Sequence, residues 1–531
     1  MPTAIIIGSG AAAAGAALAL SRRNDLQISI VDIGLQLETE RQQLVDTLAS
    51  SSPNEWDVHA IEGISNRSVG SKNRGIPEKR VFGSDFPFRN VGQLTGISMA
   101  GEATKSLVSS AYGGFSNVWG SQLMPFTASV FETWPVSAST MCGHYKEILR
   151  HIPFAGEEDD LAVNFPLMRK PVSLPQMSPR SVRVLDSYEK NRSKLNHHGI
   201  TVGKARLAFD APSCFRCGMC MTGCPYGLIY SASQTFDMLR GADKIKVHSG
   251  FLALKVEEGG SQAIVIAKQI SSGRLQRFEA DRIFIACGAI GTTRLVANSL
   301  SLFDVDLPML ESQQYVLPLV SLRATDDPRQ KPDFTLNQFN VVVSPGGDSA
   351  DISMLHFYTF NSAFIESLPA LLRARSAARL QGQILRRLSV AFGYLPSWNS
   401  PQLRIHVGSA PNHLDLPDLD ISRGATPFGH YRMLRTILLR LVQSAPLLDL
   451  YPVVPMLRLS AAGKSYHWGG SFPHMKDKSI SASDPLGRVG AWERIHLVDA
   501  SVFPSVPAMT YGLTVMANAH RIASEALELM T

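Results

Sequence analysis

Residues 4–13 read Ala-Ile-Ile-Ile-Gly-Ser-Gly-Ala-Ala-Ala and decide the fold at the N-terminus. The apolar run 4–7 predicts a short buried strand, and the alanines that follow predict a helix. Gly8 permits the tight turn, Gly10 lets the backbone approach a pyrophosphate at the helix N-terminus, and Ala13 supplies the small residue where helix meets sheet. The stretch therefore predicts a dinucleotide-binding strand-turn-helix.

A second strand at 28–31 ends in Asp32, which is placed to accept hydrogen bonds from a ribose hydroxyl. The glycine turn, the strand before it, the helix after it and the acid at the end of the second strand together favour binding of an adenine dinucleotide. The alternative is an ordinary strand-turn-helix whose small residues serve packing alone. These residues do not separate FAD from NAD.

The composition indicates a globular protein with a large core. The chain has 531 residues, 45% of them hydrophobic and 18% charged, with a net charge of +6. The basic residues do not form blocks interleaved with aromatics, so we do not expect nucleic-acid binding. The uncharged run 4–20 has no basic residue before it and is broken by glycines, so we expect a cytoplasmic protein made without export.

Motifs far from the N-terminus carry a resemblance to a known family. Residues 466–471 read Tyr-His-Trp-Gly-Gly-Ser, residues 495–504 form a strand into Asp499-Ala500-Ser501, and a helix is predicted from about 512 to Ile522. Two further segments agree, the glycine-rich loop 113–120 and the strand and glycine turn 282–290. This order resembles the glucose-methanol-choline (GMC) oxidoreductases.

The resemblance implies a fold and a domain order. We expect an α/β protein with a Rossmann-like FAD-binding domain of GMC type and a second α+β substrate domain on a mostly antiparallel sheet. The FAD-binding domain is expected at 1–300 with a cysteine-rich loop at 211–230, the substrate domain at 301–455, and the return to the FAD domain and active site at 456–531. Strands are expected at 339–343 and 402–407.

The resemblance also implies FAD and the residues around it. His467 occupies the family's catalytic histidine position, where it would act as the base while hydride passes to flavin N5. Thr510 stands where the family usually has a second His or Asn, although the alignment also allows a slip to Tyr511. Val118 replaces a histidine that binds flavin covalently in some relatives, so we expect non-covalent FAD. The expected cofactor contacts are Gly8, Gly10, Ala13, Asp32, Gly113, Gly114, Ser116, Asn117, Asp499 and Ala500.

Four cysteines with the spacing C-x2-C-x2-C-x3-C-P suggest a metal. Cys214, Cys217, Cys220 and Cys224 match the bacterial ferredoxin run, in which thiolates ligate an iron-sulfur cluster. We expect a [4Fe-4S] or [3Fe-4S] cluster, because some GMC dehydrogenases carry cysteines here that ligate one. The alternatives are a zinc site or buried thiols without metal, since other relatives, including steroid and fatty-alcohol oxidases, look similar without a cluster.

The sequence thus predicts an FAD-dependent dehydrogenase that oxidises an alcohol carbon of a sugar or polyol and relays electrons through the cluster to a carrier protein. Three alternatives remain: an enzyme of a hydrophobic alcohol such as a sterol or long-chain alcohol, an isomerase or lyase, and a non-catalytic flavin-binding or electron-carrier protein. The arginine-rich stretch 368–388 predicts an amphipathic helix. We expect its arginines to form a solvated helix face; the alternative is that they contact an anionic membrane or an acidic electron carrier.

Overall fold

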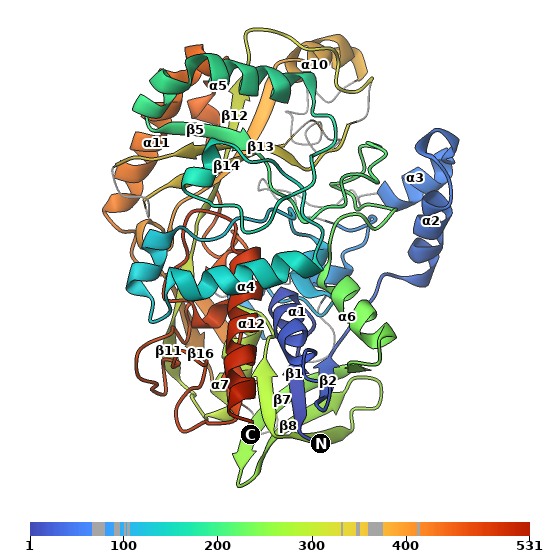
Figure 1. Cartoon of the computed structure of the whole chain (residues 1–531), viewed down its shortest axis with the longest axis vertical. Helices are drawn as coiled ribbons and strands as arrows, with labels where there is room; N and C mark the ends of the chain where they lie inside the picture. The colour runs from blue at the N-terminus through green and yellow to red at the C-terminus, as the bar shows by residue number, and fades with distance from the viewer. Residues whose placement is uncertain are drawn as a thin grey trace.

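The computed structural model in Figure 1 describes most of the chain. Its described residues are all of 1–531 except 66–79, 90–95, 100–101, 104–106, 331–332, 347–350, 359, 361–374, 411, 413–414 and 531.

A five-stranded parallel sheet forms the core of one half of the molecule. Its order is β21-β10-β1-β2-β6, and every neighbouring pair is parallel. The strands predicted at 4–7, 28–31, 282–285 and 495 onward are all present. The predicted strands are β1 (Thr3–Ile7), β2 (Gln27–Asp32), β10 (Arg282–Ile285) and β21 (Ile495–Leu497). The fifth strand of the sheet, β6 (Lys246–Ser249), was not predicted.

Two helices from opposite ends of the chain pack together beside this sheet. Helix α1 (Ala11–Leu20) is built from alanine, leucine and glycine and is buried over nearly its whole length. A Cβ atom on Gly15 would lie 2.1 Å from the carbonyl oxygen of Met516 in α12 (Gly512–Glu528), so the two backbones are in direct contact. The helices lie side by side in Figure 1. Helix α12 extends past Ile522, where the sequence predicted its end.

The remaining elements of this half surround the parallel sheet. They are α4 (Ala138–His151), α6 (Ala232–Gly241), α7 (Ala289–Ser299) and the antiparallel strands β7 (Phe251–Gly259), β8 (Gln262–Gln269) and β9 (Leu275–Ala280).

A seven-stranded antiparallel sheet dominates the other half, at the top of Figure 1. Its path is β18-β12-β15-β14-β13-β5, with β19 pairing to β12. Apolar residues of α5 (Pro179–His197) and α11 (Gly429–Leu448) pack with the sheet in one core. The strands are β5 (Ile200–Lys204), β12 (Gln314–Val320), β13 (Asn337–Val343), β14 (Ser353–Tyr358), β15 (Leu388–Tyr394), β18 (Tyr451–Pro452) and β19 (Arg458–Leu459).

A third sheet joins chain segments that the sequence assigned to different domains. Its order is β20-β11-β16-β17-β3-β4. The strands are β3 (Ile97–Met99), β4 (Glu102–Ala103), β11 (Val305–Glu311), β16 (Leu403–Val407), β17 (Leu419–Arg423) and β20 (Trp468–Gly469). Strand β5 likewise lies before residue 300 but pairs with β13. The sheets therefore cross the expected limits at 300 and 455, because strand pairing joins segments far apart in sequence.

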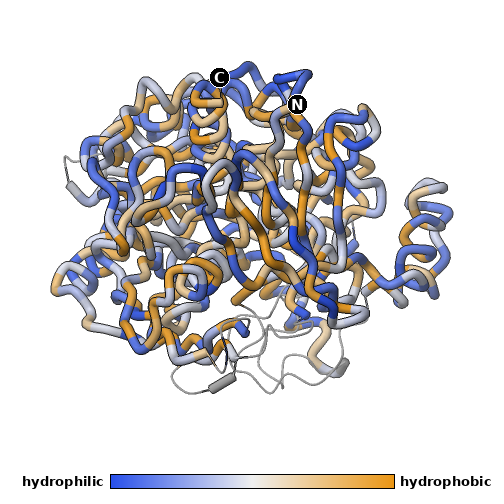
Figure 2. The backbone as a smooth tube through the Cα atoms, turned by 90° about the horizontal axis from the view of Figure 1, so that it is seen from below, coloured by the Kyte–Doolittle hydropathy of each residue, from blue (hydrophilic) through white to orange (hydrophobic). Residues whose placement is uncertain are grey.

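The fold class expected from the resemblance is confirmed by a parallel sheet flanked by helices and a second, antiparallel sheet. Figure 2 shows hydrophobic residues running along the central strands, with hydrophilic residues more frequent at the periphery. Among the described residues no helix has both the length and the apolar character needed to cross a membrane.

The arginine-rich stretch 368–388 is not one helix in its described part. Residues 368–374 lie outside the described residues, a short helix α10 (Ala378–Leu385) follows, and β15 begins at Leu388. The Nε of Arg386 donates to the carbonyl of Thr325 at 2.7 Å, so this arginine ties the end of α10 to a neighbouring loop.

Candidate active site

One continuous cavity of about 450 Å³ runs from the β1-α1 turn to the seven-stranded sheet. Its lining combines residues of the dinucleotide turn, the end of β2, the glycine-rich loop and the chain just after it, the C-terminal segment and one face of the antiparallel sheet. They include Gly8, Ser9, Gly10, Asp32, Gly114, Ser116, Gln122, Gln314, His356, Tyr358, Phe392, Tyr394, His467, Asp499, Ala500 and Thr510.

The dinucleotide turn has the backbone that its sequence predicts. Gly8 has a φ of +99°, and a Cβ there would lie 2.5 Å from the carbonyl oxygen of Ala286, so glycine is required. Gly10 is the N-cap of α1, whose free N–H groups point toward the cavity end of the helix. Ala13 is fully buried in the core and packs behind the turn.

Asp32 lies at the end of β2 on the cavity wall. Its carboxylate accepts a hydrogen bond from the Ser9 hydroxyl. Burial raises the pKa of Asp32 to about 7, with the bond from Ser9 opposing the shift. A ligand hydroxyl donating to this carboxylate would favour its ionised form.

The glycine-rich loop 113–120 packs directly on the dinucleotide turn. A Cβ on Gly114 would lie 3.0 Å from the Cα of Gly10, and the N–H of Gly113 donates to the Ser9 hydroxyl at 3.0 Å. Asn117 donates through Nδ2 to the carbonyls of Tyr112 at 2.9 Å and Gly114 at 2.8 Å. Asn117 and Gly113 thus set the shape of the loop, while Gly114 and Ser116 reach the cavity.

The C-terminal segment brings Asp499 and Ala500 to the same cavity. Asp499 is buried, accepts from the N–H of Ser501 at 2.9 Å, and also accepts from the hydroxyl of Thr292. Burial raises the pKa of its carboxyl. A Cβ on Gly469 would lie 2.6 Å from the carbonyl of Ala500, so this segment packs tightly under β20.

His467 lies at the sheet end of the cavity between two tyrosines. Its ring stacks on Tyr394 with centroids 4.3 Å apart and an interplanar angle of 15°, and meets Tyr511 edge-on at 4.7 Å. Its backbone N–H donates to the Ser465 hydroxyl at 3.2 Å, and its carbonyl accepts from the N–H of Ser312 at 3.0 Å. The imidazole is therefore held in one orientation by packing on both sides.

Thr510 lies on the same part of the wall, next in the chain to Tyr511. Its hydroxyl is buried and has no hydrogen-bond partner among the described residues. The Tyr511 hydroxyl instead donates to the carbonyl of Tyr466 at 2.9 Å. Thr510 therefore offers its hydroxyl to the cavity, whereas Tyr511 uses its own to hold the segment before His467.

Comparison with known proteins agrees with this geometry. Residues 453–519, which include His467, Asp499 and Thr510, match the family model described as GMC oxidoreductase. The C-terminal segment of the chain therefore matches the GMC oxidoreductase family, in agreement with the resemblance inferred from the sequence.

Solved structures share the fold of this chain along its whole length. Pyridoxine 4-oxidase from Mesorbium loti superposes with a TM-score of 0.60 at 15% identity, covering 99% of both chains. An FAD-dependent oxidoreductase from Chaetomium thermophilum gives 0.59 at 14% identity, covering 100% of this chain and 99% of that one. A variant of formate oxidase from Aspergillus oryzae gives 0.61 at 12% identity, covering 99% and 98%. No curated protein matches the sequence.

The residues that line the cavity fit the FAD that the resemblance to the GMC oxidoreductases implies. The cavity follows the turn from Gly8 to Gly10, where side-chain atoms are absent and backbone N–H groups are available. Its far end holds the unpartnered buried hydroxyl of Thr510. A long cavity with a glycine-lined end and a polar far end suits a dinucleotide whose reactive ring lies beside the sheet.

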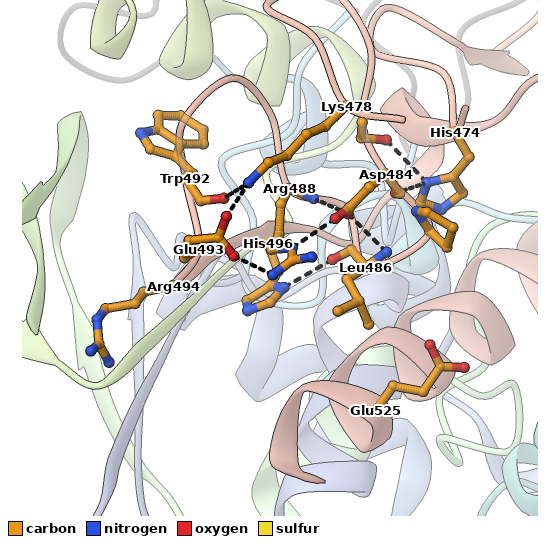
Figure 3. A network of polar contacts seen from close by, with 12 residues as sticks. His474, Lys478, Asp484, Leu486, Arg488, Trp492, Glu493, Arg494, His496 and Glu525 are labelled. Atoms are coloured by element: carbon orange, nitrogen blue, oxygen red, sulfur yellow. Dashed lines mark hydrogen bonds and ion pairs between the residues drawn. The ribbon is translucent and has the colours of Figure 1, made fainter. Parts of the chain in front are cut away.

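A polar network fastens the loop that connects His467 to Asp499 (Figure 3). The Nδ1 of His474 donates to the carbonyl of Asp484 at 2.7 Å, and Nδ1 of His496 donates to the carbonyl of Leu486 at 2.9 Å. Arg488 pairs with Asp484 at 2.7 Å. Burial lowers the pKa of both histidines, so they remain neutral donors that fix the loop.

The cysteine-rich loop braces three parts of the fold. Tyr226 stacks on Trp56 at 5.9 Å, next to the projecting helices α2 (Thr39–Ala49) and α3 (Val58–Ser65). The Sγ of Cys220 accepts from the N–H of Thr335 at 3.3 Å, just before β13. Met221 lines the cavity. The loop thus connects the projecting helices, the substrate sheet and the cavity wall.

The iron-sulfur and metal-binding assignment of Cys214, Cys217, Cys220 and Cys224 is not supported. Within the part of the chain that the structure describes, no three His, Cys, Asp or Glu side chains are grouped so that they could hold a metal ion. Cys214 and Cys220 pack against the hydrophobic core of the substrate half, and burial raises the pKa of all four thiols.

Several cavity residues carry no motif and were not found from the sequence. They come from the antiparallel sheet and from the chain just after the glycine-rich loop: Gln122, Gln314, His356, Tyr358, Phe392 and Tyr394. A period-two alternation at 356 and 358 and at 392 and 394 was the available signal, since alternate residues of a strand share a face. It indicates a shared face but not which ligand that face contacts.

Proposed function

We propose that this GMC oxidoreductase oxidises an alcohol carbon, with His467 as the base for the hydroxyl proton. The observation that carries the proposal is the place of His467, which lines the end of the cavity opposite the dinucleotide turn and is held between Tyr394 and Tyr511. An imidazole in such a position can take a proton near neutral pH.

In this proposal, one set of residues binds the cofactor and another set acts on the substrate. Asp32 accepts from a ribose hydroxyl, while Gly8, Gly10 and Gly114 let the backbone approach the pyrophosphate. When bound, FAD supplies the two-electron acceptor for the hydrogen that leaves the alcohol carbon. Thr510 donates or accepts a hydrogen bond at the substrate oxygen, and His467 removes the hydroxyl proton.

The lining favours a substrate with apolar surface over a sugar or polyol. The sheet end presents the rings of Tyr358, Phe392 and Tyr394, whereas a sugar requires a polar partner for each hydroxyl. Of the alcohols considered from the sequence, the hydrophobic class therefore fits better. No relay through the cysteine-rich loop is included, because its described thiols do not form a metal-holding group.

Anaerobic flavin reduction tests the role of His467. Purified protein is mixed with a panel of alcohols, and the flavin absorbance is followed in wild type, His467→Ala and His406→Ala. His406 is exposed on β16 and pairs with Asp306, so it serves as a matched control. We expect His467→Ala to retain FAD and to reduce the flavin roughly 10²-fold more slowly, as loss of a general base predicts.

Two results would contradict the proposal. An unchanged rate in His467→Ala removes this histidine from proton transfer. A wild-type flavin that no alcohol reduces would instead favour a different net reaction or a non-catalytic flavoprotein.

A further inference from the structure

A cluster of buried polar side chains lies beside the aromatic rings at the substrate end of the cavity. Gln122 and His356 line the cavity, and Asn337 and Asn340 stand behind them on β13. All four are at most 3% exposed. Burying uncharged polar groups inside an otherwise aromatic wall costs free energy unless their hydrogen bonds are satisfied.

A bulge in β13 places both asparagines on the cavity face. Residues three apart in a regular strand point to opposite faces. Here Asn337 pairs with Tyr358 and Asn340 pairs with His356, because the register shifts between Asn337 and Phe339. Since Tyr358 and His356 share one face of β14, both asparagines share it too. Such bulges re-aim side chains beside functional sites.

The hydrogen bonds in the cluster leave two amide donors without a partner. Asn337 Nδ2 donates to Gln122 Oε1 at 2.8 Å and to Asn340 Oδ1 at 2.6 Å, and lies 3.4 Å from His356 Nδ1. The Nε2 of Gln122 and the Nδ2 of Asn340 are buried donors with no partner among the described residues. Of these two residues, Gln122 is the one that lines the cavity.

The backbone of Gln122 is fixed from both sides. The N–H of Leu123 donates to the carbonyl of Arg206 at 2.7 Å, and the carbonyl of Ser121 accepts from the N–H of Ala208 at 2.7 Å. Gln122 cannot move far to find another partner. An unsatisfied buried donor destabilises the fold, and a ligand oxygen that accepts from it would remove that cost.

We propose that Gln122 is a specificity residue whose Nε2 donates a hydrogen bond to a neutral oxygen on a flat, aromatic alcohol, at a position remote from the reacting hydroxyl. This inference rests on the proposed alcohol oxidation and names its substrate class. The ring of the substrate packs against Tyr358, Phe392 and Tyr394. The acceptor is neutral because the side chains of Gln122, Asn337 and Asn340 bear no charge to balance an anion.

Two alcohols of equal shape test the proposal in the holoenzyme. In 4-acetylbenzyl alcohol the remote group carries a carbonyl oxygen, and in 4-isopropylbenzyl alcohol a methyl group takes its place. The readout is kcat/KM of anaerobic flavin reduction for each alcohol in wild type, Gln122→Met and Gln122→Glu. The Gln122→Glu variant keeps an acceptor for Asn337 and, because burial favours the neutral carboxyl, an O–H donor as well, so it is the conservative comparison for Gln122→Met. Gln43→Met on the exposed side of α2 is the control.

The expected result is a selective loss. Gln122→Met lowers kcat/KM for the acetyl compound about tenfold and leaves the isopropyl compound within about twofold, with FAD content unchanged, as loss of one neutral hydrogen bond predicts. Gln122→Glu retains more of the activity toward the acetyl compound than Gln122→Met does. Comparing each alcohol with itself across variants removes the electronic difference between the two compounds.

Other outcomes overturn the inference. Equal losses for both alcohols would mean that Gln122 only shapes the cavity. Preference for 4-(hydroxymethyl)benzoate over the acetyl compound would exclude a neutral acceptor. Reduction by aliphatic alcohols but by neither aromatic one would exclude the substrate class while leaving alcohol oxidation intact. Failure of every alcohol would contradict the proposed function itself.

Discussion

The two ends of the cavity are built by different means. The dinucleotide end consists of glycines and backbone, with Gly114 against Gly10 and Gly8 against Ala286. The substrate end consists of side chains, with Tyr394 stacked on His467 and Gln122 held by Asn337. Backbone recognition leaves no room for a side chain, whereas side-chain recognition can be changed one residue at a time. We therefore expect substitutions at the first end to affect the fold and those at the second to affect the substrate.

The largest expected effect is at the helix contact that supports the dinucleotide end. Gly15→Ala puts a methyl group 2.1 Å from the Met516 carbonyl, and backbone cannot yield as a side chain can. We expect a loss of roughly 3 kcal/mol or more in the free energy of unfolding, and little FAD-bound protein. Thermal unfolding and FAD content measure this loss.

Gly143→Ala in α4 is the matched control, because a Cβ there meets nothing within 4 Å. It should be neutral or slightly stabilising, since alanine is the better helix former. A Gly15→Ala protein as stable as this control would mean that α1 and α12 can move apart, and the contrast between the two ends would fail.

The next effect is a pH dependence confined to the dinucleotide end. The raised pKa of Asp32, about 7 without ligand, means that the carboxyl is protonated below that pH and ionised above it. A ribose hydroxyl donates to the ionised form, so FAD should bind up to about tenfold more tightly per pH unit between pH 5.5 and 7, then level off. FAD fluorescence released on dilution of the holoenzyme reports the affinity.

Asp32→Asn cannot ionise and should bind FAD with an affinity that is flat over the same window. A variant that keeps the wild-type slope would assign the pH dependence to another group. His467→Ala should leave the slope unchanged, because it lies at the substrate end.

The smallest effect concerns the ring stacked on His467. Tyr394→Leu removes the stack and the acceptor for Gln314, whose Nε2 donates to the Tyr394 hydroxyl at 2.9 Å. We expect flavin reduction to slow about tenfold with FAD binding unchanged, because the imidazole loses its fixed orientation. Tyr394→Phe keeps the ring and should stay within about threefold of wild type. Stopped-flow reduction of both variants tests this order, and equal rates would show that the stack does not position His467.

The sequence predicted the structure best where the residues that a turn or strand needs are neighbours in one short segment. The turn from Gly8 to Gly10, the strand ending in Asp32 and the strand before Asp499 need specific residues at neighbouring positions, and the structure has each of these strands. The cysteine-rich loop shows the limit of the same method. Its spacing is that of a cluster ligand set, yet the directions of its side chains depend on Phe82, Trp56 and Thr335, which lie elsewhere in the chain.

By itself, the sequence determined the N-terminal strand-turn-helix, the strand that ends in Asp32 and the resemblance to the GMC oxidoreductases, because local backbone geometry and short motifs specify them. Which side chains meet at the substrate end of the cavity is decided only by the tertiary structure. Gln122 meets Asn337 across 215 positions of sequence, and Tyr394 meets His467 through the pairing of separate strands. No local pattern records such contacts, because a bulge in β13 and the packing of two sheets bring these side chains together.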